Sequence, residues 1–326
     1  MEYVKFGRTN LKVSRLCLGA MGFGSTSWRR WVLDKQASGE IVVSALDHGI
    51  NFFDTCDFYS AGESERILSE VLLSQVPRDS VVVATKAGNP MAKHVNGRGF
   101  SRKHLFNAVD ASLKRLGTDY IDLFQTHIWD PTTDVDELVD AFADIVRSGK
   151  ALYIGAATMP AWTMALALSK AAAAHLPQFV SMQCEYNPAH RECERELLPL
   201  CRDQKIALIP FSPIARGFLA ADRRDPSNST ARTQSDDYTL KYYHRAEDFA
   251  VFDAVTEVAT RYDATPAQVS LAWTLSQKGI TSPIFGATAT EHVDAAVAAL
   301  DIRLMPEDIA VISKAYVSRP LSEGGH

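Results

Sequence analysis

Four polar side chains with complementary proton chemistry follow three short apolar runs. NFFDTCDFY contains Asp54 and then Tyr59, VVVATK ends at Lys86, and DLFQT is followed by His127. A phenol ordinarily has a pKa near ~10, which is too high for ready proton exchange at neutral pH. A lysine ammonium within hydrogen-bond reach would lower that pKa, and a carboxylate would hold the ammonium in place. A histidine beside them would contact the oxygen of a substrate.

Each of these residues also has an ordinary structural explanation. A tyrosine shortly after an aspartate commonly packs in a loop, a single histidine at a strand end is commonly a satisfied core group, and a buried Lys–Asp pair is often structural. A catalytic site is therefore indicated only by the occurrence of all four residues together. If they converge, the tyrosine is an acid aimed at an oxygen that becomes alkoxide-like as hydride arrives, which predicts carbonyl reduction and its reverse.

Short β-branched runs alternate with amphipathic stretches along nearly the whole chain. The strand candidates are residues 15–18, 51–54, 81–86, 121–125, 152–156, 179–183, 207–210 and 283–285. Helical periodicity is clearest over 101–116, 134–148 and 191–204. Eight strand–helix units without a dividing linker predict a single α/β domain over residues 1–326, folded as a (β/α)8 TIM barrel. In such barrels the reacting groups lie at the C-terminal ends of the strands, where the four polar residues fall.

Two loops bear on how such a barrel would bind a dinucleotide. The first strand–helix turn reads GAMGFG, which is not the G-x-G-x-x-G of a doubly wound sheet, and a long loop rather than a helix follows it. Residues 217–245 lack a regular pattern and follow the seventh strand, where barrels often bind phosphate. We expect a lid over the cofactor there, with a mobile surface insertion as the alternative.

Composition excludes several classes of partner. The chain has 326 residues, of which 34 are basic and 39 acidic, and its net charge of −5 favours neither nucleic acid nor an anionic membrane. The five cysteines are scattered without a CxxC pair, and no HxH or HExxH occurs, so neither a disulfide framework nor a metal site is expected. No signal-peptide pattern or membrane-spanning apolar run is present. These features predict a cytoplasmic protein with a small-molecule substrate and leave the oligomeric state open.

Longer motifs identify the family that the chain resembles. INFFDTCDFY, VVVATKAG, RLGTDYIDLFQTH, SMQCEYNPAHRECERELLPLC and PFSPIARGFL closely resemble aldo-keto reductase motifs in the same order, over essentially the whole chain. The resemblance implies an NAD(P)(H)-dependent oxidoreductase acting on aldehydes, ketones or alcohols. Its catalytic tetrad would be Asp54, Tyr59, Lys86 and His127. HIWDP and SPIARG are most similar to a bacterial branch that acts on aryl aldehydes and alcohols or on sugar-like carbonyls.

The resemblance also implies where the cofactor and the substrate bind. Gln183 matches an amide that contacts the nicotinamide carboxamide, and Phe211 matches an aromatic residue that stacks on the ring. The other cofactor residues carried over are Gly19, Ala20, Met21, Asp54, Ala157, Thr158, Ser212, Pro213, Ile214, Gly217, Arg232, Gly286, Thr288 and His292. The expected substrate-binding residues, mostly aromatic side chains that fit flat substrates, are Trp28, Phe58, His127 and Trp129.

The adenosine end departs from the family pattern. GATATEHVDAA keeps Gly286 and Thr288, but Ala289 replaces the usual base and His292 replaces an amide or an arginine. Binding of a 2′-phosphate relies on charge-assisted donors, which are scarce in this segment. On family grounds NADP(H) is favoured, and NAD(H) stays an alternative.

A non-enzymatic function is the second hypothesis. Potassium-channel β subunits are similar barrels that act chiefly as binding partners, so a nucleotide-binding regulatory subunit would share the motifs. The intact tetrad argues against it. Turnover of an aromatic aldehyde separates the two hypotheses, because a pure binding module would hold nucleotide without useful turnover.

Overall fold

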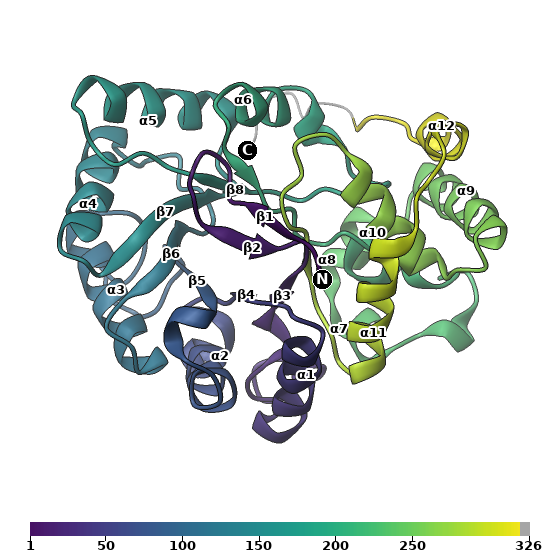
Figure 1. The fold of residues 1–326 in the computed structure, drawn as a ribbon, viewed down its shortest axis with the longest axis horizontal. Coiled ribbons are helices and arrows are strands. Elements are labelled where there is room, and N and C mark those ends of the chain that lie inside the picture. The colour runs from purple at the N-terminus through teal and green to yellow at the C-terminus, as the bar shows by residue number, and fades with distance from the viewer. Residues whose placement is uncertain (320–326) are drawn as a thin grey trace.

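Eight parallel strands form the centre of the protein (Figure 1). The computed structural model describes residues 1–319, apart from the side chains of residues 237 and 240. The strands are β3 (Cys17–Gly19), β4 (Phe52–Asp54), β5 (Val82–Ala87), β6 (Ile121–Thr126), β7 (Ala151–Ala157), β8 (Ser181–Gln183), β9 (Ala207–Leu208) and β10 (Ile284–Phe285). They pair in the order β10-β3-β4-β5-β6-β7-β8-β9, and parallel bridges join Leu208 to Ile280 and Phe211 to Ile284. These bridges close the sheet, which confirms the predicted (β/α)8 barrel.

Helices follow the strands and cover the outside of the barrel. The helices are α1 (Lys35–Asp47), α2 (Glu63–Leu68), α3 (Arg102–Leu116), α4 (Val135–Arg147), α5 (Ala161–Ala173), α6 (Leu197–Asp203), α7 (Ala231–Ser235), α8 (Asp237–Tyr242), α9 (Ala246–Arg261), α10 (Pro266–Ser276), α11 (Thr290–Ala298) and α12 (Pro306–Ala315). α3 and α4 confirm two predicted helices. The helix predicted over 191–204 is wrong in its first half, where only a 3-10 turn forms and α6 begins at Leu197. Pro199 explains this start, because proline is tolerated in the first turn of a helix but not in its interior.

Alternation along the strands divides the apolar side chains into two cores. The core inside the barrel includes Cys17, Phe52, Val82, Ala84, Leu123, Val180, Ala207, Ile209 and Ile284. Their sequence neighbours, such as Leu18, Phe53 and Val83, belong to the core beneath the helices. Successive side chains of a strand point to opposite faces, so a residue two positions after an interior residue also points inward.

A hairpin that the sequence analysis did not predict covers one end of the barrel. β1 (Tyr3–Lys5) and β2 (Lys12–Ser14) pair antiparallel and cross in front of the barrel strands in Figure 1. Phe6 and Val13 join the interior core, and the Phe6 ring meets Phe52 edge-on at 5.6 Å between centroids. Since Phe52 begins β4 and Asp54 ends it, the hairpin closes the end opposite the polar residues.

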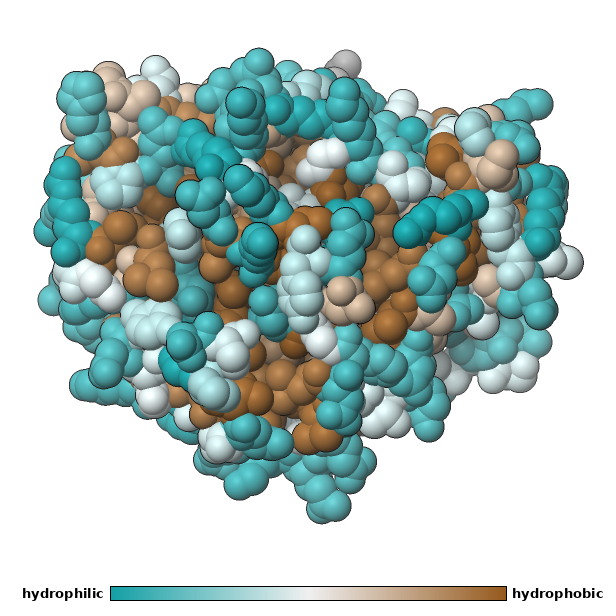
Figure 2. All heavy atoms as spheres, viewed as in Figure 1, coloured by the Kyte–Doolittle hydropathy of each residue, from teal (hydrophilic) through white to brown (hydrophobic). Residues whose placement is uncertain are grey.

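The surface on the hairpin side is mixed in character. Hydrophilic side chains are spread over the whole face shown in Figure 2, with hydrophobic patches between them. Within residues 1–319, no helix combines the length and the apolar character needed to cross a membrane.

Phe6→Ala should lower the free energy of unfolding by about 3–5 kcal/mol, because it removes a buried ring and leaves a cavity under the hairpin. Urea denaturation followed by circular dichroism measures the change. Val95→Ala, at a residue that is 91% exposed, is the control and should change the free energy by less than about 0.5 kcal/mol. A Phe6 variant as stable as the control would contradict the role of the hairpin in closing the barrel core.

Candidate active site

Strand alternation brings polar side chains into one layer at the C-terminal end of the barrel. Asp54 lies two positions after Phe52, and Lys86 lies two positions after Ala84, so both share the inward direction of the interior core. Gln183 ends β8 on the same side of the barrel, and all three polar side chains are buried. This layer is therefore where the barrel can hold reacting groups away from bulk water.

The Lys86 ammonium is the centre of this layer. Its Nζ donates to Asp54 Oδ1 at 2.5 Å and lies 3.4 Å from the Tyr59 hydroxyl oxygen. Asp54 Oδ2 accepts hydrogen bonds from Gln125 Nε2 at 3.2 Å and from Gln183 Nε2 at 3.1 Å. Both carboxylate oxygens are thus satisfied inside the protein, which a buried ion pair requires.

Burial and the Lys86 charge act in opposite directions on the tyrosine. Burial raises the pKa of Tyr59 to about 12, although the ammonium lowers it. The sequence predicted a lowered pKa; the lysine does act that way, but burial outweighs it. For Lys86, burial would lower the pKa, but the Asp54 carboxylate outweighs burial and raises it above the usual value. At neutral pH the site therefore holds a protonated phenol beside a protonated amine.

The backbone after Tyr59 makes an unusual turn. Ser60 and Ala61 have φ values of 50° and 54°, in the left-handed region that residues other than glycine rarely adopt. Such conformations persist only where surrounding contacts enforce them. Ser60 Oγ accepts a hydrogen bond from the Ser25 amide at 3.2 Å, which ties the turn to the loop after β3. The turn leaves the Tyr59 ring centroid 5.0 Å from Lys86 Nζ.

His127 completes the group from the end of the next strand. Its ring lies edge-on to the Tyr59 ring, with 5.7 Å between centroids. Burial lowers the pKa of His127 to about 3, and the Lys86 charge acts in the same direction. The imidazole is therefore neutral at physiological pH. All four residues that the sequence singled out meet in one place.

Aromatic side chains flank this group from the loops after β3, β4 and β6. The Trp28 ring centroid is 6.1 Å from that of Phe58 and 6.3 Å from that of Tyr59. Trp129 stacks on Phe100 at 5.9 Å between centroids. The expected substrate residues Trp28, Phe58 and Trp129 are each half-buried, so part of each ring is open to a ligand. Partly exposed aromatic surface of this kind suits a flat apolar molecule.

The residues expected at the nicotinamide lie on the neighbouring strand ends. Gly19 ends β3, and Ala20 and Met21 form the 3-10 turn that follows it. At the end of β7, Ala157 is buried, and the Thr158 hydroxyl donates to the His127 carbonyl oxygen at 2.6 Å. The Thr158 hydroxyl therefore already has a protein acceptor.

The segment after β9 has a strained backbone. It contains the predicted cofactor residues Phe211, Ser212, Pro213, Ile214 and Gly217. Ser212, Ala215 and Arg216 have φ values of 55°, 50° and 57°, and Gly217 has a φ of 93°. Within the segment, the backbone N–H groups of Ala215 and Gly217 donate to the carbonyl oxygens of Ser212 and Ile214, at 2.8 and 2.9 Å.

Three arginines, Arg29, Arg216 and Arg232, form an arginine cluster beside this segment. Arg216 Nη2 and Arg232 Nε both donate to Asp236 Oδ2, at 2.6 and 3.3 Å, and the Arg232 guanidinium stacks on Trp31. Burial lowers the pKa of Arg232 to about 10; Arg216 and Arg29 also lower it, and Asp236 opposes them. Among the side chains that the structure describes, this cluster places three positive charges around one carboxylate.

The residues expected at the adenosine lie between β10 and α11. Gly286 has open space where a Cβ would stand. The Thr288 amide donates to His292 Nδ1 at 3.2 Å, so this ring nitrogen is engaged as an acceptor within its own segment. His292 consequently has only its other nitrogen available for a ligand.

The segment over 217–245 is not the patternless loop that the sequence predicted, because it contains the short helices α7 and α8. Tyr238 donates its hydroxyl to Glu185 Oε2 at 2.7 Å, and Tyr243 donates to the other oxygen of the same carboxylate. Tyr243 is fully buried, with its ring stacked on Phe218, and is a core residue. The sequence analysis missed Glu185, although an acidic residue just after the eighth strand was a visible signal.

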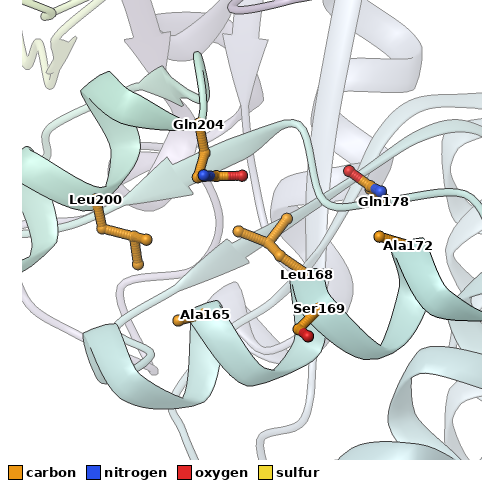
Figure 3. A pocket seen from close by; sticks show the side chains of 7 residues that line it. All are labelled: Ala165, Leu168, Ser169, Ala172, Gln178, Leu200 and Gln204. Atoms are coloured by element: carbon orange, nitrogen blue, oxygen red, sulfur yellow. The ribbon is translucent and has the colours of Figure 1, made fainter.

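A hollow on the outside of the barrel offers no comparable chemistry. It has a volume of about 220 Å³ between α5 and α6, and Figure 3 shows the side chains that line it: Ala165, Leu168, Ser169, Ala172, Gln178, Leu200 and Gln204. None of these groups titrates near neutral pH. In the part of the chain that the structure describes, no cluster of histidine, cysteine or acidic side chains could hold a metal ion. The C-terminal strand ends are therefore the candidate active site.

Comparison with known proteins places this geometry in a family. The profile of the Aldo/keto reductase family matches residues 15–317. A versiconal hemiacetal acetate reductase of Aspergillus parasiticus is 39% identical, with 99% of each chain covered. Putative aryl-alcohol dehydrogenases of Schizosaccharomyces pombe and Saccharomyces cerevisiae are 37% and 38% identical, with at least 97% of each chain covered. These relatives are fungal and give no support to the bacterial branch expected above. The chain belongs to the aldo/keto reductase family and is an oxidoreductase.

Proposed function

We propose that this protein moves hydride reversibly between a nicotinamide cofactor and the carbonyl carbon of an aldehyde or ketone. In this proposal Tyr59 is the general acid in reduction and the general base in oxidation. The observation that carries it is the buried Lys86 ammonium, which lies 2.5 Å from Asp54 and 3.4 Å from the Tyr59 hydroxyl. We further propose that residues 1–326 act as one catalytic domain.

The residues present fit a nicotinamide dinucleotide. The arginine cluster carries more positive charge than Asp236 offsets, and the phosphate groups of NADP(H), with the 2′-phosphate nearest Arg232, would supply the missing negative charge. The strained segment 212–217 holds Arg216 in place at this cluster, so the positive charge comes from side chains rather than from free backbone N–H groups. Phe211 and Gln183 would hold the nicotinamide end, with NADP(H) favoured and NAD(H) an alternative. When bound in its reduced form, this cofactor supplies the hydride that the carbonyl carbon accepts.

Tyr59 supplies the proton that completes the reduction. Its hydroxyl stays protonated at neutral pH, so it donates a hydrogen bond to the carbonyl oxygen and then transfers the proton as that oxygen gains charge. The phenolate that remains is stabilised by Lys86, which Asp54 keeps charged. In alcohol oxidation the same phenolate accepts the hydroxyl proton, and the ion pair returns to its starting state.

The substrate class that we propose is aryl aldehydes and the corresponding alcohols. Trp28, Phe58 and Trp129 offer partly exposed rings on both sides of the tetrad. Several relatives carry the name aryl-alcohol dehydrogenase, which agrees with such a pocket. The regulatory-subunit hypothesis predicts bound nucleotide without turnover, so an assay with an aromatic aldehyde tests both.

Tyr59→Phe should lower kcat for aldehyde reduction by about 10²–10⁴-fold, because the proton donor is lost while the ring remains. Cofactor affinity, measured by fluorescence titration, should stay within a factor of two to three of wild type. Tyr3→Phe removes the equivalent oxygen at the opposite end of the barrel and should leave kcat unchanged. A Tyr59 variant that keeps most of its rate would rule out this proton donor.

Lys86→Met should move the pH optimum of alcohol oxidation upwards. Lys86 lowers the pKa of Tyr59, so its loss leaves the phenolate available only at still higher pH. Because the single change strands the buried Asp54 charge, the double variant Asp54→Asn with Lys86→Met is measured in parallel. An active variant with the wild-type pH profile would contradict the role of the ammonium.

Preference for NADPH over NADH should be the same at pH 6 and pH 8 and should fall about tenfold or more in Arg232→Ala, since a charge-assisted hydrogen bond contributes about 1.5–3 kcal/mol. His292 Nδ1 already accepts from Thr288, so His292→Ala should have the smaller effect. The ratio of kcat/KM for the two cofactors measures this preference. A preference that survives Arg232→Ala and is lost in His292→Ala would place the 2′-phosphate at α11 instead.

A further inference from the structure

The ring of His127 has two protein neighbours on one nitrogen. Asn89 Nδ2 lies 2.6 Å from His127 Nδ1, and Cys56 Sγ lies 3.0 Å from the same atom. For Nε2, no hydrogen-bond partner is found among the side chains that the structure describes. A neutral imidazole carries a single N–H, and the partner of one nitrogen decides which nitrogen holds it. The contacts at Nδ1 therefore determine what His127 offers to a ligand.

In the orientation that the structure gives to the Asn89 amide, its contact makes Nδ1 the acceptor. An amide nitrogen only donates hydrogen bonds, so it can approach a ring nitrogen at 2.6 Å only if that nitrogen carries no proton. His127 is neutral, because burial lowers its pKa to about 3. Its one proton must then be on Nε2.

Cys56 points to the same tautomer. Burial raises the pKa of this thiol well above its usual value, so the sulfur keeps its proton. The Phe58 amide already donates to the sulfur at 3.4 Å, and the thiol has Asp57 Oδ1 within 3.3 Å as an acceptor. Sulfur is only a weak acceptor, so with its S–H directed to Asp57 the thiol is a poor partner for a proton on Nδ1. Neither contact offers a strong acceptor for such a proton.

A glycine turn places Asn89 at this position. Gly88 has a φ of 124°, and a Cβ there would lie 2.5 Å from Cε1 of Phe100. Only glycine fits this combination of backbone conformation and close approach. The turn at the end of β5 thus brings Asn89 onto His127, while Phe100 packs on Trp129.

We propose that Asn89 is a positioning residue that holds His127 as the Nε2–H tautomer, with Cys56 beside it. His127 then donates a hydrogen bond to the oxygen of the substrate from one side while Tyr59 donates from the other. A carbonyl oxygen has two lone pairs and accepts both bonds. The second half of this inference rests on the proposed function, whereas the tautomer itself does not.

The tautomer can be measured directly on the full chain. Long-range ¹H–¹⁵N correlation spectra of protein labelled with ¹⁵N-histidine distinguish Nε2–H, Nδ1–H and imidazolium forms, and a His127→Gln spectrum assigns the signals. We expect His127 to be neutral with its proton on Nε2 at pH 7. A wild-type spectrum showing Nδ1–H or imidazolium overturns the proposal, whatever the activity.

Asn89→Asp replaces the donor with an acceptor of the same shape. We expect His127 to gain a proton on Nδ1, and kcat for aldehyde reduction to fall at least about tenfold, as losses of partners that orient functional histidines typically do. KM for the cofactor should change little. Asn51→Asp is the matched control, since Asn51 lies at the hairpin end of β4 and accepts from Ser14; it should leave the tautomer and kcat as in wild type.

Two further outcomes separate this inference from the proposed function. An Asn89→Asp protein whose His127 stays Nε2–H and whose kcat is unchanged overturns the positioning role of Asn89. If Asn89→Asp does not fold, Asn89→Ala removes the donor without adding charge, and the same two readouts apply. A wild-type protein with Nε2–H but no turnover of any carbonyl supports the tautomer and contradicts the proposed function.

Discussion

The rest of the site depends on the buried ion pair between Lys86 and Asp54. Taking an ammonium and a carboxylate out of water costs several kcal/mol per ion, and the cost is offset only if their remaining hydrogen-bond capacity is used. Lys86 also donates to the Thr55 carbonyl oxygen at 2.8 Å. Asp54 accepts hydrogen bonds from the side-chain amides of Gln125 and Gln183. The partners come from β4, β5, β6 and β8, so the ion pair is complete only when these strands have curled into a barrel.

Burial keeps two different neighbours of the Lys86 ammonium in their neutral forms. Burial disfavours whichever form of a group is charged, so it raises the pKa of Tyr59 and lowers that of His127. The Lys86 ammonium lowers both, which moderates the effect on the phenol and strengthens it on the imidazole. Both groups are consequently hydrogen-bond donors over a wide range of pH. Lys86 contributes most when Tyr59 releases its proton, because the ammonium then stabilises the phenolate.

The sequence was sufficient to predict the barrel and to bring the tetrad together, for a physical reason. Asp54, Lys86 and His127 each follow an apolar run directly or within a few residues, and the C-terminal ends of parallel barrel strands share one rim, so their meeting could be predicted. The direction of the Tyr59 pKa was not accessible, because it depends on how deeply the ring is buried. Asn89 was also missed, because its contact with His127 depends on the path of the chain at Gly88.

Other elements were not predicted because they are too short or too irregular to show a periodic pattern of apolar residues. Each strand of the hairpin has three residues, and α7 and α8 have five and six, which is less than the windows from which a pattern is read. The amphipathic pattern over 191–204 is real, but Pro199 limits where the helix can begin. Glu185 lies in the motif SMQCEYNPAH. Its role as the common acceptor for Tyr238 and Tyr243 could not be predicted, because it depends on the fold of segment 217–245.

The first and last strands of the barrel, β3 and β10, meet where the barrel closes. The Arg15 guanidinium donates to the carbonyl oxygens of Leu275, Ile280 and Thr281, across 260 to 266 residues of sequence. During synthesis the first strand emerges from the ribosome long before these partners exist, and its edge stays unpaired until nearly the whole chain is available. Closure is therefore a late step with a large loop-closure entropy. A nascent or truncated chain lacking residues 275–285 would present open strand edges to its neighbours, the usual starting point of aggregation.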